Sequence, residues 1–464
     1  MNLKPVEKDI LEDPLLIKLS ILAKEKNIPL FLVGGHIRDL LLGTHQKDYD
    51  LTLPREASSF ISMIEDTLHL RFFKVGKEEL DTVTYRIIKE KMSMDIALLQ
   101  GRTIEDDLKR RDFTVNAVAF SLREGRFHWV ERALEDIEKR IIRAVSDRSI
   151  DLDPLRMLRA IRYLSTLPGF RLDHELKNQI SSKKELILKL PGERIKTEID
   201  QILLSPRPGV GITSLYELGP LPALFPELRM LGILNQSEHH HLNVLGHTLL
   251  IIDKIPWAFE WLARKGSQVQ LSEENRLSLF YSALFHDTGK QDTYSIDENG
   301  NVHFYDHPFH SCRRAEGIME RLRFSNAMRD NVLRLVKNHM RILNMSGETK
   351  ETTLKRLVHR MGEETPLLVL HTLADKEASR GKLSIQVDEV VEGHCLRILD
   401  LFQQDHVVHP PPLIKGEDVM ALGYHPGPKV GKILNFIRQK QVDGEINTRE
   451  EALEVLQERF SLYK

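Results

Sequence analysis

The chain has few cysteines, no long apolar run and almost no net charge. Its 464 residues include only Cys312 and Cys395, which predicts no disulfide framework and fits a reducing compartment. The opening MNLKPVEKDILEDP lacks the apolar core of a secretory signal, and no later run approaches the ~18 apolar residues of a membrane span. The formal charge of −2 means that a polyanionic partner needs a local basic surface. We therefore expect a cytoplasmic protein that does not associate with membranes.

Hydrophobic periodicity divides the chain into a short mixed part and a long helical part. Residues 1–29 carry a helical apolar stripe, and residues 30–100 contain the β-like runs LFLV, DYDLTL, RFFKVG, DTVTYRII and MSMDIALL, with a helix near 60–69. After Gly101 nearly all of the pattern has the helical period. The length allows two to four domains, because single cores rarely exceed roughly 250 residues. The sequence predicts an α+β fold, with a sheet-containing head followed by an elongated all-α body.

A pair of glycines followed by a pair of aspartates is the most informative feature of the head. In LFLVGGHIRDLLLGTHQKDYDLTL, Asp48 and Asp50 lie two apart on a predicted strand, so their side chains project from the same face. Carboxylates this close repel each other unless a divalent cation or a proton lies between them. Gly34 and Gly35 end the preceding strand, where backbone N–H groups can approach a phosphate. Arg38 adds a positive charge one turn into the following helix.

This combination favours a two-metal site for phosphoryl or nucleotidyl transfer. One Mg²⁺ would activate an attacking hydroxyl, and the other would stabilise the leaving pyrophosphate. Asp95, on the outward face of MSMDIALL, is a candidate third carboxylate, so the predicted catalytic residues are Asp48, Asp50 and Asp95. An Asp-x-Asp pair alone is more often a solvated surface turn. It is the glycines and the arginine at this spacing that favour the metal site.

Two arginine-rich stretches extend this prediction. DDLKRRDFTVNAVAF (106–120) and LDPLRMLRAIRYL (152–164) place charged side chains beside apolar runs. In the second stretch Arg156, Arg159 and Arg162 follow one edge of a helix, without acidic partners four residues away. We therefore expect them to meet an anion from outside the protein, and arginine and aspartate side chains to read a base edge. A solvated basic face is the alternative.

Taken together, GGHIRDLLLG…KDYDLTL, KRRDFTVNA and DPLRMLRAIR resemble the bacterial class II tRNA nucleotidyltransferase and poly(A) polymerase family over residues 28–228. The resemblance implies a polymerase β-like palm in the head, and template-independent addition of C and A from CTP and ATP to tRNA 3′ ends, or of A to other RNAs. It also implies that Asp48 and Asp50 hold Mg²⁺, and that Asp153 and Arg156 hydrogen-bond to the incoming base. The candidate nucleotide-binding residues are Gly34, Gly35, Arg38, Arg111, Asp112, Asn116, Asp153, Arg156, Arg159 and Arg162.

One position departs from the family pattern. The base-reading motif of the family usually runs Glu-Asp-x-x-Arg, and Leu152 occupies the position of the glutamate. Because leucine cannot form a salt bridge, we expect Arg156 to be less tightly oriented. The choice between C and A is then expected to be less strict.

The body contains a second constellation of polar residues on successive predicted helices. ALFHDTGK places His286 beside Asp287, with further candidate ligands on both sides along the chain. A single inward histidine is usually a hydrogen-bonded core residue, but the order H…HD…H…H…D resembles the HD-superfamily metal-dependent phosphohydrolases over about 230–380. The candidate metal ligands are His247, His286, Asp287, His310, His339 and Asp375. We interpret His239 and His240 of EHHHL as part of a solvent-facing loop.

The chemistry of these ligands indicates a transition metal. Neutral imidazoles and carboxylates suit Ni²⁺, Mn²⁺, Co²⁺ or Zn²⁺. Such an ion would activate water against a phosphoester. The resemblance implies hydrolysis of 2′,3′-cyclic phosphates and 2′-phosphates, as in relatives that fuse this domain to the nucleotidyltransferase.

Four regions are expected along the chain. They are a nucleotidyltransferase head at 1–145, a helical base-reading and RNA-binding neck at 146–228, an HD domain at 229–385 and a C-terminal helical RNA-binding tail at 386–464. In the tail, PGPKVGKIL with Lys429 and Lys432 could hold an RNA phosphate, although a packing element fits equally well.

Three functions are compatible with these patterns. The leading one is a Mg²⁺-dependent nucleotidyltransferase that acts at tRNA 3′ ends and carries an HD phosphohydrolase domain. A poly(A) polymerase, or an enzyme restricted to CC or A addition, would use the same chemistry, and the sequence does not separate them. An HD phosphohydrolase whose head only senses nucleotide or RNA belongs to another class, and the intact Asp-x-Asp argues against it. The oligomeric state is left open.

Overall fold

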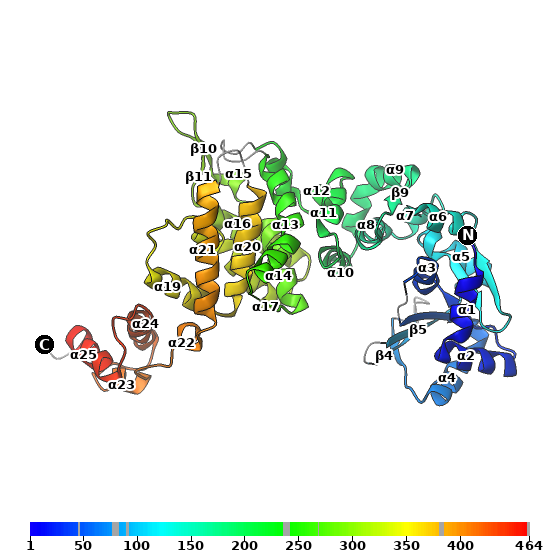
Figure 1. Cartoon of the computed structure of the whole chain (residues 1–464), viewed down its shortest axis with the longest axis horizontal. Coiled ribbons are helices and arrows are strands. Elements are labelled where there is room, and N and C mark those ends of the chain that lie inside the picture. Colours follow the sequence, from blue (N-terminus) through cyan, green and yellow to red (C-terminus); the bar gives the residue numbers. More distant parts are fainter. Residues whose placement is uncertain are drawn as a thin grey trace. The chain divides into compact units, whose positions relative to one another are not determined.

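The computed structural model describes residues 1–44, 47–76, 83–89, 92–234, 242–267, 269–379 and 385–461 (Figure 1). The chain folds into two compact units. The first is Met1–Leu190 with Ser214–Leu224, and the second is Pro191–Thr213 with the chain from Phe225 onward. The boundary expected after residue 145 therefore lies inside the first unit, because the following helices pack with the head. The finer division into four regions stays a prediction.

The first unit combines a sheet with short helices. Its helices are α1 (Lys4–Glu12), α2 (Pro14–Glu25), α3 (Gly35–Leu41), α4 (Phe60–Leu68), α5 (Ile104–Lys109), α6 (Ala133–Lys139), α7 (Ser149–Leu152), α8 (Arg156–Thr166), α9 (His174–Lys183) and α12 (Pro220–Leu224). Its strands are β1 (Phe31–Val33), β2 (Asp48–Leu53), β3 (Phe73–Val75), β4 (Thr84–Lys89), β5 (Met92–Leu98), β6 (Val118–Ser121), β7 (Arg126–Trp129), β8 (Ile141–Ile142) and β9 (Arg171–Leu172). The helix α11 (Pro208–Glu217) contains residues of both units.

Among the described residues, seven strands form a mixed sheet in the order β3-β4-β5-β2-β1-β6-β7. β2 pairs in parallel with β5, and the other neighbours are antiparallel. Each of the five predicted β-like runs contains a strand. In this unit the expectation of helices after Gly101 is wrong for β6, β7, β8 and β9. VAFS is buried at every position, and such a short apolar run has no period that separates a buried strand from a buried helix.

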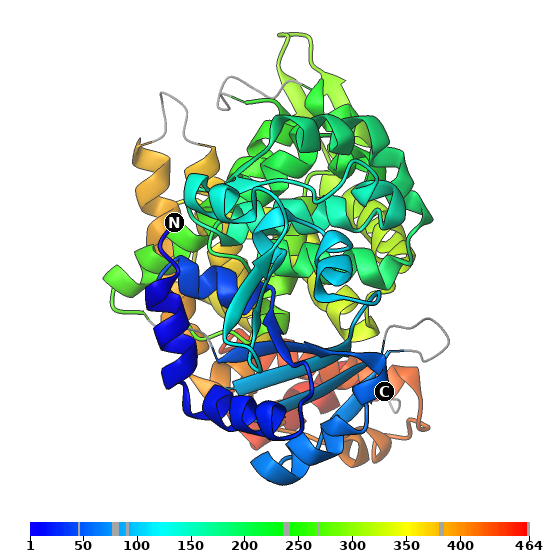
Figure 2. The ribbon, with the colours of Figure 1, turned by 90° about the vertical axis from the view of Figure 1, so that its right-hand side faces the viewer.

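The two faces of the sheet differ in what covers them. Tyr49 and Leu51 are buried on one face, toward the helices α1 and α2, which are dark blue in Figure 2. Tyr49 donates its hydroxyl hydrogen to Asp13, the N-cap residue of α2 (2.8 Å). Because side chains alternate along a strand, Asp48 and Asp50 project from the opposite face. The core of the unit therefore packs against one face of β2, and Asp48 and Asp50 project from the other face.

In its described residues, the second unit is helical apart from one hairpin. Its elements are α10 (Gly192–Leu203), α13 (Val244–Arg264), α14 (Glu273–Phe285), α15 (Lys290–Thr293), β10 (Tyr294–Ile296), β11 (Val302–Phe304), α16 (His307–Arg321), α17 (Asn326–Asn338), α18 (Met340–Leu343), α19 (Glu351–Met361), α20 (Thr365–Ala378), α21 (Ile385–Phe402), α22 (Asp405–Val408), α23 (Gly416–Met420), α24 (Pro428–Val442) and α25 (Arg449–Phe460). α13 and α20 pack side by side, α14 packs on both of them, and α21 packs on α20 (Figure 1).

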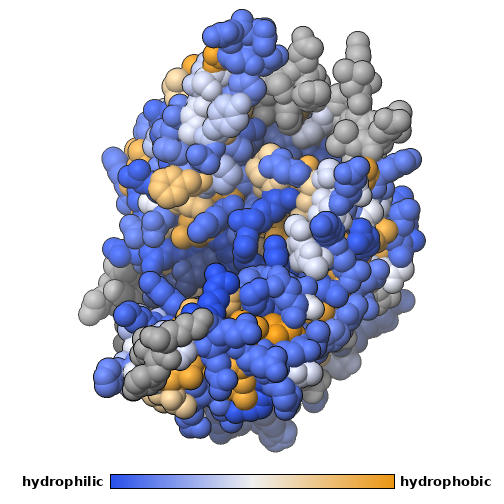
Figure 3. Space-filling model, turned by 90° about the vertical axis from the view of Figure 1, so that its left-hand side faces the viewer, coloured by the Kyte–Doolittle hydropathy of each residue, from blue (hydrophilic) through white to orange (hydrophobic). Residues whose placement is uncertain are grey.

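The C-terminal helices gather a small core of their own. Val419, Val430 and Ile433 are buried within it, while Lys429 and Lys432 are exposed. The face shown in Figure 3 is largely hydrophilic, with its hydrophobic side chains in small groups. Within the described ranges, no helix has both the length and the apolar character needed to cross a membrane.

Candidate active site and metal centre

The three predicted catalytic carboxylates lie on one face of the sheet. In the parallel pair of β2 and β5, Asp50 is directly opposite Asp95, and Asp48 is opposite Ser93. Paired residues on neighbouring strands project to the same side, so the acids share one surface. Asp48 is exposed and accepts a hydrogen bond from the Ser93 hydroxyl (2.6 Å). The shared face is as predicted, and the catalytic roles stay predictions.

The electrostatics of this surface favour a bound cation. The pKa of Asp50 is raised to about 6, first by burial, which outweighs the lowering effect of Arg111, and also by the carboxylates of Asp95 and Asp48. A divalent cation would relieve this repulsion, and carboxylate oxygens are ligands that Mg²⁺ prefers. The side chains present therefore fit the predicted Mg²⁺ site.

Asp95 differs from the other two acids because an arginine already holds it. Arg86 on β4 donates from Nε (2.7 Å) and Nη2 (2.5 Å) to the two oxygens of Asp95. Such a bidentate pair is strong and fixes the orientation of both side chains. As a third metal ligand Asp95 would have to share its oxygens with Arg86, and this role stays a prediction.

The double glycine lets Arg111 approach the acids. Gly34 has a φ of +74°, and a Cβ atom added to it would lie 2.9 Å from Arg111 Nη1 and 3.5 Å from Asp50 Oδ2. A larger residue at this position would be strained and would displace the guanidinium. Arg111 is oriented by Asp107, whose Oδ2 accepts from Nη2 (3.1 Å) and Nε (3.3 Å). Gly35 begins the next helix, α3.

Four predicted nucleotide-binding side chains belong to one polar network, and three of them, Arg38, Asn116 and Asp112, are buried. Arg38 donates from Nη1 to Asn116 (2.7 Å), and Asn116 donates to Asp112 Oδ1 (3.1 Å). Asp112 Oδ2 lies 2.7 Å from Arg159 Nη2. Burial alone would raise the pKa of Asp112, but Arg159 and Asn116 lower it below its ordinary value. These side chains bind one another, so their direct contact with a nucleotide stays a prediction.

The expectation that the arginines of α8 find no anion inside the protein is wrong for Arg159. Its partner Asp112 lies just before the short helix η3 (Thr114–Asn116), far away in sequence, so helical spacing could not reveal the pair. Arg162 lies over the ring of Tyr163, with Cζ 4.8 Å from its centroid. Asp153 Oδ1 accepts a hydrogen bond from the backbone N–H of Leu155 (3.2 Å) at the start of this helix.

Arg156 is firmly oriented, contrary to the expectation drawn from Leu152. Its guanidinium donates to the Ser149 hydroxyl (2.7 Å) and to the carbonyl oxygens of Arg110 (2.7 Å) and Arg111 (3.2 Å). Leu152 is 65% exposed. Backbone carbonyls therefore supply the orientation that a glutamate at position 152 would otherwise provide.

The Asp112–Arg159 pair should contribute measurably to stability. Replacing Asp112 by asparagine leaves the positive charge of Arg159 without its anion, and removing one partner of a buried pair is destabilising. Because Arg159 is partly exposed, we expect the free energy of unfolding to fall by roughly 2 kcal/mol, less than for a fully buried pair. Urea unfolding of the full chain measures this change.

A matched control is the exposed pair of Asp151 and Lys183, whose charged atoms are 2.6 Å apart. Surface pairs contribute about 0–1 kcal/mol, so Asp151→Asn should change stability much less. Equal effects of the two substitutions would contradict a structural role for Asp112.

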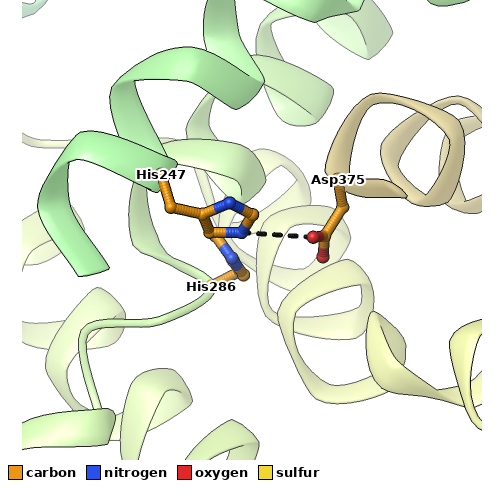
Figure 4. Close-up of side chains that lie close together, drawn as sticks. All are labelled: His247, His286 and Asp375. Carbon is orange, nitrogen blue, oxygen red and sulfur yellow. Dashed lines mark ion pairs between the residues drawn. The ribbon is translucent and has the colours of Figure 1, made fainter. Parts of the chain in front are cut away.

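Five of the six predicted HD residues meet in the core of the second unit, and Figure 4 shows three of them, His247, His286 and Asp375. His247 comes from α13 and Asp375 from α20, and His247 Nε2 lies 3.2 Å from Asp375 Oδ1. His286 and Asp287 follow α14, and His339 follows α17. In each of two groups, His247 with His286 and Asp375, and His286 with Asp287 and His339, one potential ligand atom per residue lies within 4.8 Å of the others. All five side chains are buried.

His310, the sixth predicted ligand, is not part of this cluster. It is partly exposed, and its Nδ1 lies 3.9 Å from Asp292 Oδ2. Its place is taken by His307, whose Nε2 lies 3.2 Å from His339 Nε2 and 3.4 Å from Asp287 Oδ1. His307 and His310 both belong to DHPFHSCRRAE. Of the two, it is His307, the first residue of α16, that faces Asp287. The prediction of His310 was therefore wrong by one helical turn.

The charges of the cluster fit a divalent transition metal. Burial lowers the pKa of His307 and of His339, which keeps both imidazoles neutral, whereas at His286 the carboxylate of Asp287 outweighs burial and raises the pKa. Burial would raise the pKa of Asp287, but His286 and Lys290 hold it well below its ordinary value. Neutral imidazoles and ionised carboxylates are the forms that bind such metals. The Nε2 atoms of His307 and His339 also face each other at 3.2 Å. A metal ion shared by the two atoms would suit this arrangement better than a direct contact between them.

Comparisons with known proteins agree with this geometry. The matching family models are the "Poly A polymerase head domain" (30–143), the "Probable RNA and SrmB-binding site of polymerase A" (169–231), the "HD domain" (238–379) and "tRNA nucleotidyltransferase domain 2" (309–456). The chain is 32% identical over 430 residues to an A-adding tRNA nucleotidyltransferase of Deinococcus radiodurans, covering 91% of this chain and 93% of the relative. This chain belongs to the tRNA nucleotidyltransferase family. A CC-adding member from Thermus thermophilus is 31% identical over 436 residues, covering 91% and 92%.

A solved structure of a tRNA nucleotidyltransferase shares the fold. The Thermotoga maritima CCA-adding enzyme complexed with tRNA has a TM-score of 0.61 and 20% identity, and the match covers 98% of each chain. The α+β architecture, with a nucleotidyltransferase head followed by a helical body that contains an HD domain, is confirmed.

Sequence reasoning missed two histidines of this tRNA nucleotidyltransferase. His307 could not be separated from His310 by residue type. His371 is buried with its ring centroid 5.3 Å from that of His286, and burial lowers its pKa to about 4. Here a usable pattern existed, because His371 precedes Asp375 by four residues on α20 and so shares its helical face. His239 and His240 lie outside the described residues, and the interpretation of EHHHL stays a prediction.

Proposed function

We propose that this protein is a template-independent nucleotidyltransferase that adds C, A or both, from CTP and ATP, to the 3′ end of tRNA. The observation that carries the proposal is the row of Asp48, Asp50 and Asp95 on an open sheet face, beside a glycine turn that admits Arg111. The similarity to A-adding and CC-adding enzymes over nine-tenths of the chain supports the same chemistry.

Each group near the acids has a distinct task in the proposed reaction. The 3′ oxygen of the RNA attacks the α-phosphorus of the nucleotide, and the bond to the leaving pyrophosphate breaks. Mg²⁺ held by Asp48 and Asp50 would supply the charge that activates the hydroxyl and stabilises the leaving group. Arg111, which Asp107 holds and which lies against Gly34, would neutralise phosphate oxygens.

The base is proposed to be selected at the start of α8. Asp153 and Arg156 present acceptor and donor groups that can pair with the edge of cytosine or adenine. Three hydrogen bonds orient the guanidinium of Arg156 and limit how far it can move when one base replaces the other.

The number of added nucleotides is the direct test of the proposal. The protein is incubated with CTP, ATP and Mg²⁺ and with a tRNA that either lacks CCA or ends in CC. The first RNA should grow by two or three residues, or the second by one. A long A tail would favour a poly(A) polymerase.

Arg156→Ala should weaken the choice between CTP and ATP more than it slows total incorporation. One good bidentate contact is worth about 1–3 kcal/mol of discrimination, so the ratio of kcat/KM for the two nucleotides should fall about tenfold. Ser149→Ala is the control, because it removes one orienting hydrogen bond and keeps the guanidinium. An unchanged ratio in Arg156→Ala would show that the base is read elsewhere.

We also propose that the HD cluster binds a divalent transition metal and hydrolyses phosphoesters, with 2′,3′-cyclic phosphates or 2′-phosphates as substrates. The specific support is the pair of ligand groups centred on His286, and the facing Nε2 atoms of His307 and His339. When bound, the metal would supply an activated water. Lys290, whose Nζ lies 2.7 Å from Asp287 Oδ2, would balance negative charge beside it.

A further inference from the structure

The catalytic face of the sheet continues beyond the acids onto the two outer strands, β3 and β4. Phe73 is paired opposite Arg86, Arg86 is opposite Asp95, and Asp95 is opposite Asp50. Because paired residues project to the same side, these four side chains form one row across the sheet. The row begins at the edge strand and ends at the predicted metal ligand.

Apolar side chains are exposed on this part of the face. Phe73 is 51% exposed and Ile88 is 65% exposed, and Val75 is also open to solvent. Ile87, which projects from the other face of β4, is buried. Single exposed apolar residues are ordinary, but several on the open face of an edge hairpin favour unwanted association. Their place beside the acids therefore calls for a ligand that covers them. We call Phe73, Val75, Arg86 and Ile88 the outer platform.

The outer platform also carries positive charge. The side chain of Arg86 is 42% exposed although Asp95 holds it, so its charge is accessible from solvent. On the same face the surface leads into a cavity of about 340 Å³, which Arg110 and Arg111 line. An exposed aromatic ring with arginines and other apolar side chains beside it is a combination that binds single-stranded nucleic acid, because a base stacks on the ring and the arginines pair with phosphates.

We infer that the outer platform binds the unpaired nucleotides at the 3′ end of the RNA substrate, with their bases stacked on Phe73 and Ile88. The inference rests on the proposed function of the head. Neighbouring strands are ~4.8 Å apart, so Phe73 lies roughly 14 Å from Asp50, across three strand spacings. This distance is too long for the reacting 3′ hydroxyl, and it suits the nucleotides that precede it. The platform thus holds the end of the RNA while the last nucleotide stays at the acids.

The sharpest test combines a change in the protein with a change in the RNA. Binding of the full chain is measured by fluorescence anisotropy, without nucleotide, to a tRNA and to the same tRNA shortened by two unpaired 3′ nucleotides. The wild type should bind the shortened RNA about tenfold more weakly, because stacked bases are lost. In Phe73→Ala the difference in affinity between the two RNAs should be much smaller, because one stacking partner is lost, and Phe73→Trp should restore it. A double-mutant cycle of this kind isolates the contact between the two partners.

Turnover gives a second readout. In single-nucleotide incorporation, Phe73→Ala should raise KM for tRNA about tenfold and leave kcat and KM for the nucleotide within twofold. Ile88→Ala should act in the same direction, which keeps the test valid if one variant folds poorly. Trp129→Ala is the matched control, because Trp129 is 47% exposed on β7 at the far edge of the same sheet and projects from its other face.

Two results would overturn the inference. One is an equal loss of affinity on shortening the RNA in the wild type and in Phe73→Ala. The other is a change of oligomeric state in Phe73→Ala by sedimentation with unchanged RNA binding, which would assign the platform to contact between two copies. Failure of the proposed function would differ from both, because the wild type would then incorporate no nucleotide.

Discussion

Replacing Asp48 by asparagine should lower the rate of nucleotide incorporation at least about a thousandfold, which corresponds to about 4 kcal/mol. Asp48 is the exposed acid of the row, and Ser93 is the partner that hydrogen-bonds to it. The amide keeps the size of the side chain and can still accept that hydrogen bond. It removes the negative charge that would hold Mg²⁺. The measurement is single-turnover incorporation of CTP or ATP into tRNA over a series of Mg²⁺ concentrations.

Asp66→Asn provides the matched control for this prediction. It makes the same chemical change on α4, in the same unit, at an exposed residue away from the acids. This variant should incorporate nucleotides at the wild-type rate. Thermal unfolding of both variants should match the wild type, because neither side chain is buried. Activity of Asp48→Asn within tenfold of the wild type would exclude it as a metal ligand.

Replacing Asp287 by asparagine should remove the metal of the HD cluster and its phosphohydrolase activity. Asp287 faces His286, His307 and Lys290, so all three groups share its negative charge. After purification in Ni²⁺, Mn²⁺, Co²⁺ or Zn²⁺, the wild type should retain a metal through dialysis and the variant should not. Hydrolysis of a 2′,3′-cyclic nucleotide should fall at least about a hundredfold. Nucleotide incorporation should stay within twofold, because the two sites use separate side chains.

A buried charge can also stabilise the fold, so two further variants separate loss of the metal from unfolding. Asp330→Asn, at an exposed position on α17, should keep both the metal and the hydrolysis. His247→Gln removes a ligand at the other end of the cluster and should give the same metal loss if Asp287→Asn unfolds. A folded Asp287→Asn variant that retains a full complement of metal would refute the assignment.

Much of the head could be predicted because its information is local. A strand has a period of two, so Asp48 and Asp50 had to share a face once DYDLTL was interpreted as a strand. The glycine turn and the helices before it follow from the same short-range patterns. The H…HD…H…H…D order likewise predicted five of the residues that meet in the second unit. These features depend on neighbours in the sequence or on a resemblance carried by whole motifs.

What could not be predicted depends on partners brought together by the tertiary fold. Arg159 pairs with Asp112, which no helical spacing connects to it, and Arg156 is oriented by two backbone carbonyls that have no sequence signature. The choice of His307 over His310 depends on the direction in which α16 starts. Strand β6 was missed because a fully buried run loses the alternation that marks a half-exposed strand.

The hydrogen bond between Tyr49 and Asp13 ties the start of α2 to the strand that carries the predicted catalytic acids. Tyr49 sits between the two acids in the chain, and its phenol ends on the cap of α2, where burial and Asp13 raise its pKa. A protein trimmed to begin after Asp13 would lose this hydrogen bond. The buried hydroxyl of Tyr49 would then have no partner, directly behind Asp48 and Asp50. A truncation that spares every residue on the face of the acids would therefore still disturb that face.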